Sequence, residues 1–230
     1  MAYKLGPEKP FEPKKPSVTI ETLREQPPEF VADAENSYAC HALSQRSARL
    51  REWFFNNWPM RYRSMMDDRL DLETVEKALC WDWTHGKNLI LIGPTGSGKT
   101  WLAWQVVKKH VCDLGVKTES ALESQLSISI GDKAMSGSLS AYLEELCTPT
   151  LLFVDDLGKA PPTERYLASL YHISERRYAH SKPTILTTQY GEDELLAKWS
   201  SRGDANTAHA IARRLAEGAS TIKVDSSTNL

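Results

Sequence analysis

The chain has 230 residues, of which 41% are hydrophobic and 25% are charged. This composition is ordinary for a soluble globular protein, and the length allows one full domain plus an N-terminal appendage. The formal net charge is −2, so nucleic-acid binding would require a local basic patch rather than a global positive field. The four cysteines form no metal-binding pair, and the apolar stretches are too short for a membrane span. We therefore expect a cytoplasmic protein with no membrane contact.

Residues 1–57 predict a segment distinct from the rest of the chain. Six prolines among the first thirty residues oppose helix and sheet and indicate an extended arm. From Pro28 to Asn57 apolar residues recur at helical spacing. Arginines such as Arg51 alternate there with aromatic residues such as Trp53, which suits either stacking on single-stranded nucleic acid or a packed helix with solvated arginines. We expect 1–57 to contact a partner and 58–230 to form the main domain.

Beyond Trp58 the sequence alternates between short apolar strands and amphipathic helices. The expected strands are 88–92, 116–120, 150–154, 184–188 and 221–224. The expected helices are 100–112, 162–180, 192–199 and 208–216, with one or two more in 121–147 interrupted by Gly131 and Gly137. The side chains expected to face inward from helix 162–180 are Leu167, Leu170, Tyr171 and Ile173. Apolar strands separated by helices predict an α/β fold whose parallel sheet is covered on both faces.

The segment from Gly93 to Thr100 matches G-x-x-x-x-G-K-S/T at every fixed position, between a predicted strand and a predicted helix. Its glycines let backbone N–H groups face phosphate oxygens, and the helix N-terminus adds partial positive charge. We expect Lys99 to contact the β- and γ-phosphates of ATP and the Thr100 hydroxyl to ligate Mg²⁺. The other residues of the expected phosphate-binding loop are Gly93, Pro94, Thr95, Gly96, Ser97 and Gly98.

A strand that ends in two carboxylates predicts the second half of the site. Four apolar residues, 151–154, precede Asp155 and Asp156, and ligands bind at the carboxyl edge of open α/β sheets. We expect Asp155 to hold Mg²⁺ through its water shell and Asp156 to orient or deprotonate the attacking water. The alternative for Asp156 is a carboxylate that only shapes the loop before Gly158.

Together these segments resemble the DnaC-type helicase loaders and the IstB-type transposition helper ATPases of the AAA+ class. The resemblance covers Trp58 to Val224. Besides the two motifs, the segments that carry it are Trp58–Arg63, Gly86–Asn88, Ile173–Tyr178 and Lys182–Thr188. It implies an AAA+-like P-loop NTPase fold with five parallel strands flanked by helices, strand 184–188 between the two motif strands, and no C-terminal lid domain.

The resemblance implies two further site residues. Gln189 stands where the family has asparagine, at the tip of strand 184–188, and would sense the γ-phosphate. The segment Ala212–Leu215 resembles the one that carries the arginine finger. Its register favours Arg214, with Arg213 second, as the residue inserted into the site of a neighbouring subunit. The alternative is a helix-end arginine paired with a carboxylate.

The resemblance implies an ATPase that loads a replicative helicase onto single-stranded DNA, with ATP bound between self-associated subunits. A close alternative is a transposition helper that binds duplex DNA. A P-loop small-molecule kinase and an adaptor that binds ATP but barely hydrolyses it are further alternatives. For the adenine base, the segment around Trp81 is a candidate contact.

Overall fold

The structure, a computed structural model, describes residues 44–63, 70–201 and 204–225. The chain divides into two compact units, Met1–Arg46 and Ser47–Leu230. The expected proline-rich arm and the first part of the helix expected from Pro28 lie outside the described residues. Partner contact by residues 1–57 therefore stays a proposal, and the fold described below is that of the second unit.

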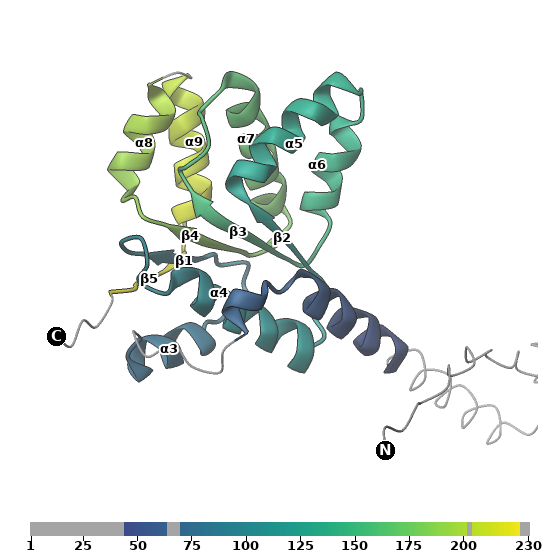
Figure 1. The fold of residues 1–230 in the computed structure, drawn as a ribbon. Coiled ribbons are helices and arrows are strands. Elements are labelled where there is room, and N and C mark those ends of the chain that lie inside the picture. Colours follow the sequence, from purple (N-terminus) through teal and green to yellow (C-terminus); the bar gives the residue numbers. More distant parts are fainter. Residues whose placement is uncertain (1–43, 64–69, 202–203, 226–230) are drawn as a thin grey trace, which may run out of the picture. The chain divides into compact units, whose positions relative to one another are not determined.

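A parallel five-stranded sheet organises the second unit (Figure 1). The strands are β1 (Leu89–Ile92), β2 (Thr118–Leu122), β3 (Leu151–Leu157), β4 (Thr184–Thr188) and β5 (Ser220–Lys223). Their order is β2-β3-β4-β1-β5, and each neighbouring pair is parallel. The expected α/β class and the expected place of β4 between the two motif strands are confirmed.

Helices lie against both faces of the sheet (Figure 1). One face carries α5 (Glu123–Met135), α6 (Leu139–Cys147), α7 (Glu164–Ala179), α8 (Glu192–Ser200) and α9 (Ala205–Ala216). The other carries α3 (Leu72–Leu79), α4 (Lys99–Lys108), the π-helical turn Lys109–Asp113 and the helical residues 47–57, followed by the short 3₁₀ helix η1 (Met60–Tyr62). Among the described residues, no helix combines the length and the hydrophobicity that crossing a bilayer requires.

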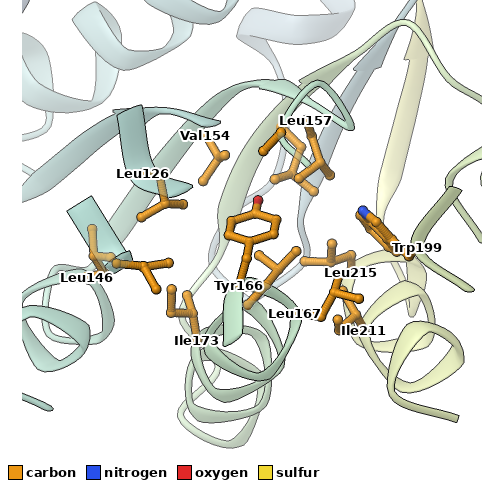
Figure 2. Packing of buried hydrophobic residues seen from close by; sticks show 14 of the residues in the cluster. Leu126, Leu146, Val154, Leu157, Tyr166, Leu167, Ile173, Trp199, Ile211 and Leu215 are labelled. Atoms are coloured by element: carbon orange, nitrogen blue, oxygen red, sulfur yellow. The ribbon is translucent and has the colours of Figure 1, made fainter. Parts of the chain in front are cut away.

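Alternate residues of β3 enter two separate hydrophobic cores. Leu152 and Val154 pack with α5 to α9, and Leu151 and Phe153 pack with α4. Successive side chains of a strand point to opposite faces, so a strand covered on both faces is apolar throughout, as 151–154 is. Figure 2 shows the first core, with Tyr166 of α7 near its centre.

The described part of the predicted N-terminal helix packs on the second core. Phe54 is fully buried, and its ring centroid lies 6.1 Å from that of Trp104 in α4. Trp58 is 6% exposed, whereas Phe55 is half exposed. Phe54 and Trp58 therefore follow the packed-helix interpretation, because their rings are not available for stacking on bases.

Two expectations about the helices are wrong. Tyr171, expected to face inward, is 39% exposed. Tyr166 is the inward tyrosine, because its hydroxyl donates a hydrogen bond of 2.7 Å to Oε1 of the buried Glu123. Gly131 does not interrupt a helix, since α5 continues through it, whereas Gly137 lies between α5 and α6 with a φ of +71°.

A buried arginine near the end of α7 holds the amino edge of the sheet together. Arg177 is 2% exposed and donates hydrogen bonds to Thr184 Oγ1 and to four backbone carbonyls, those of Leu146, Pro149, Thr150 and Pro183. Burial lowers the pKa of Arg177 to about 10, so the group remains charged at neutral pH. These bonds join α7 to the starts of β3 and β4.

Replacing Arg177 with methionine should lower the free energy of unfolding by about 3–5 kcal/mol, because several buried carbonyls lose their donor. Urea unfolding followed by circular dichroism measures this. The matched control is Arg176→Met, which removes a half-exposed arginine paired with Glu144 and should change stability by less than about 1 kcal/mol. Equal losses from both variants would contradict the structural role of Arg177.

Candidate functional site

The loop between β1 and α4 has a backbone that requires glycine. Gly96 and Gly98 have φ values of +85° and +93°, a region that other residues seldom adopt. At Gly93, a Cβ would lie 2.1 Å from the carbonyl oxygen of Val224. Gly98 is the N-cap of α4, so the first turn of this helix opens onto the loop. This is the geometry in which helix N-termini bind phosphate.

Lys99 is the first residue of α4 and is 6% exposed. Its Nζ donates a hydrogen bond of 2.7 Å to the carbonyl of Pro94, which folds the side chain over the loop. That bond uses one of the three donors of an ammonium group. Burial lowers the pKa of Lys99, and the nearby carboxylates of Asp156 and Asp155 oppose that shift.

The carboxylate of Asp155 joins three elements at the carboxyl edge of the sheet. Thr100 Oγ1 of α4 donates a hydrogen bond of 2.9 Å to Asp155 Oδ1, and Thr187 Oγ1 of β4 donates to the same oxygen. The Thr187 hydroxyl also accepts a bond of 2.8 Å from the backbone N–H of Asp156. Burial raises the pKa of Asp155, and the two hydroxyl donors counteract that rise by stabilising the carboxylate.

The paired oxygens of Thr100 and Asp155 fit Mg²⁺. Hydroxyl and carboxylate oxygens are hard ligands, and Mg²⁺ is usually held by one or two carboxylates together with substrate phosphates and water. In the described part of the chain no group of three His, Cys, Asp or Glu side chains could hold a metal ion by itself. The two residues therefore suit an ion that arrives with a nucleotide.

A β-bulge turns Asp156 toward the site. The strand β3 continues to Leu157, beyond its expected end at 154. Its register against β4 shifts between Val154 and Leu157. Asp156 has a φ of +63°, which is uncommon for a residue other than glycine. Bulges beside functional sites often redirect a side chain in this way. The Asp156 carboxylate forms an ion pair of 2.9 Å with Lys159.

A cavity of about 200 Å³ lies beside the loop. Its lining includes Arg61, Tyr62, Lys99, Thr100, Asp156 and Lys159. Gln189 reaches the same region, because its Oε1 accepts a hydrogen bond of 2.8 Å from Thr95 Oγ1. The structure thus brings together the loop, both carboxylates and Gln189, as the sequence predicts.

Arg214 lies at the opposite edge of the sheet. Asn88, which precedes β1, donates to the backbone carbonyls of Arg214 and Leu215, whereas the phosphate-binding loop follows the other end of β1. The Arg214 guanidinium donates a bond of 2.6 Å to Glu175 and lies 4.4 Å from the ring centroid of Tyr178. The ion-pair alternative therefore describes Arg214 in this structure.

Arg213 is the more accessible of the two arginines. Its side chain is 75% exposed, against 26% for that of Arg214. A cavity of about 490 Å³ opens beside Arg214, with Lys87 and Tyr178 in its lining. The register of the family resemblance favours Arg214 as the finger, whereas the greater exposure of its side chain favours Arg213.

Sequence reasoning missed Thr187 and Lys159. A hydroxyl in a wholly buried strand such as β4 needs a partner, and this signal could have identified Thr187. In the adenine candidate, the ring of Trp81 packs 5.5 Å from that of His110, which follows α4 at the end remote from the loop. Adenine contact by this segment stays a prediction. Tyr62, by contrast, lines the cavity at the loop.

Comparison with protein families gives one match over most of the chain. The model of the family described as IstB-like ATP binding protein matches residues 51–229. A curated relative, an ATP-binding protein of insertion sequence IS1162 from Pseudomonas fluorescens, is 36% identical over 125 residues. That match covers 52% of this chain and 52% of the relative, so the chain spans about half the length of the curated protein it matches.

Solved structures share the fold at low sequence identity. DnaI is 18% identical with a TM-score of 0.58 over 76% of this chain and 93% of its own. The DnaC helicase loader is 21% identical with a TM-score of 0.54 over 67% and 87%. AMPPCP-bound DnaA from Aquifex aeolicus is 19% identical with a TM-score of 0.50 over 66% and 44%. These matches confirm the AAA+-like fold.

Replacing Thr187 with valine should weaken Mg²⁺-dependent ATP binding by about tenfold, because the partly buried Asp155 loses one hydroxyl donor and the Asp156 N–H loses its acceptor. Titration calorimetry with and without Mg²⁺ measures the effect. Thr221→Val, at an exposed position of β5, is the matched control and should leave binding unchanged. If the two variants bind Mg²⁺ and ATP equally well, Thr187 does not support the metal site.

Proposed function

Because the chain belongs to the family of IstB-like ATP-binding proteins, we propose that it hydrolyses ATP and uses the ATP-bound state to assemble on DNA. The observation that carries the proposal is the bonded set of Thr100, Asp155 and Thr187 beside the glycine loop. This set supports the proposal because the Thr100 hydroxyl and the Asp155 carboxylate meet beside the glycine loop, next to a cavity that Asp156 lines.

The residues around the cavity supply the groups that phosphoryl transfer to water needs. A water oxygen bonds to the γ-phosphorus, the bond from that phosphorus to the β,γ-bridging oxygen breaks, and ADP and phosphate leave. Asp156 accepts the proton of the water, while Lys99 and the loop amides stabilise charge on the phosphate oxygens. Thr100 and Asp155 would hold Mg²⁺, which would supply positive charge against the phosphate oxygens. Gln189, which is bonded to Thr95 of the loop, senses the γ-phosphate.

The arginines at the amino edge would complete the site of a neighbouring subunit. Arg213 and Arg214 lie at the edge of the sheet away from their own loop, so they could act only on a second copy of the chain. An arginine supplied in this way accelerates hydrolysis by about 10³–10⁵-fold in related chemistry. Self-association through the ATP site is therefore part of the proposal.

Hydrolysis and self-association are tested together by mixing variants. Asp156→Asn should bind ATP and lose turnover, and Arg214→Ala should bind ATP and hydrolyse slowly. Mixing them should partly restore activity, because the intact Asp156 of one variant meets the intact arginine of the other. The same mixture with Arg213→Ala shows which arginine acts. Absence of rescue with both arginine variants at every ratio would contradict action between subunits.

Two functions on DNA have support. Loading of a replicative helicase onto single-stranded DNA is supported by the fold shared with the DnaC helicase loader and DnaI over most of their lengths. Transposition on duplex DNA is supported by the family match and by the insertion-sequence relative. Both functions require ATP-dependent assembly on DNA, and they differ in whether single-stranded or duplex DNA is bound.

Binding to single-stranded and duplex oligonucleotides of equal length distinguishes a helicase loader from a transposition helper. Fluorescence anisotropy is measured with an ATP analogue and with ADP across a range of salt concentrations, since charge-driven binding weakens with salt. A loader should prefer the single strand and form a complex with a hexameric helicase; a transposition helper should prefer the duplex. If ATP increases binding to neither DNA, the assembly proposal fails and the hydrolysis proposal is judged by the variants above.

A further inference from the structure

Lys159 is a cation in the phosphate cavity to which the proposed hydrolysis assigns no role. Its Nζ lies 2.9 Å from Asp156 Oδ2. Lys159 lines the same cavity as Lys99 and Thr100, and its positive charge contributes to the lowered pKa of Lys99. Two ammonium groups and a helix N-terminus thus face one small space, which favours an anion between them.

The backbone on either side of Lys159 is fixed. Gly158 has a φ of +97°, and a Cβ there would lie 2.5 Å from the Tyr190 ring. The Ala160 N–H donates a bond of 2.6 Å to the fully buried Glu123. The side chain of Lys159, by contrast, is 40% exposed. A rigid turn therefore carries a long side chain that can change partner without moving the loop.

We propose that Lys159 is a second phosphate-binding cation that exchanges one partner for another. Without nucleotide it pairs with Asp156; with ATP bound it binds an oxygen of the γ-phosphate and leaves the Asp156 carboxylate free for water. The release of Asp156 for catalysis rests on the proposed hydrolysis, whereas the exchange of partners does not.

The exchange follows from the relative strength of the two pairings. An ion pair between partly exposed side chains is weak. A γ-phosphate bears more charge than a carboxylate and offers several acceptor oxygens within the same cavity, so it competes well for the ammonium group. ADP lacks this group and leaves Lys159 with Asp156. Lys159 therefore makes the site prefer ATP over ADP.

The test is the affinity of Lys159→Gln for a non-hydrolysable ATP analogue and for ADP, measured by titration calorimetry with Mg²⁺. We expect the dissociation constant for the ATP analogue to rise about tenfold and that for ADP to change less than about twofold, as loss of one charge-assisted bond predicts. Lys159→Arg should retain most of the preference, and Lys133→Gln, which removes an α5 lysine outside the cavity, should change neither value. Equal losses for both nucleotides, or no loss, would overturn the proposal.

The competing role of Asp156 is tested by a double-mutant cycle. Asp156→Asn should increase the preference for the ATP analogue when Lys159 is present, and this increase should disappear in the Lys159→Gln background. An identical increase in both backgrounds would show that Asp156 does not compete with the γ-phosphate for Lys159. If the wild-type protein binds the ATP analogue more tightly than ADP but hydrolyses no ATP, the proposed function fails and this inference stands.

Discussion

The site depends on one partly buried carboxylate that is held by two hydroxyl groups. Burial disfavours the charge on Asp155, and the hydroxyls of Thr100 and Thr187 offset part of that cost by donating to it. The donors come from α4 and β4, which are distant in sequence. The bonded set therefore forms only when β3, β4 and α4 have packed together in the folded domain. The proposed metal-binding pair is thus a product of the fold rather than of either motif alone.

The parallel sheet separates two groups of candidate functional residues at its two edges. The carboxyl edge bears the loop, Asp155 and Asp156, and the amino edge bears the two arginines and the cavity beside them. Buried polar anchors hold each edge. Arg177 joins the starts of β3 and β4, and Glu123 fixes the turn that follows β3. The bond from the backbone N–H of Ala160 to Glu123 fixes the turn that carries Lys159, which the proposed exchange of partners requires.

Sequence patterns predict the parts of the site that are local in the chain. The glycine loop and the carboxylates near the end of β3 are each continuous segments with a fixed chemistry, and the family resemblance adds the strand order. Thr187 and Lys159 were missed because their roles depend on contacts across strands or within one turn. Tyr166 rather than Tyr171 faces inward, because its hydroxyl bonds Glu123, a buried acceptor far away in sequence. Periodicity alone cannot reveal such partners.

The central claim is that magnesium nucleotide binds where the glycine loop meets Asp155. A crystal structure of the full chain with Mg²⁺ and a non-hydrolysable ATP analogue tests it most directly. The account predicts phosphate oxygens on the amides of the loop, with the metal beside Thr100 Oγ1 and the Asp155 carboxylate. Nucleotide bound elsewhere, or a metal without either residue near it, would contradict the account.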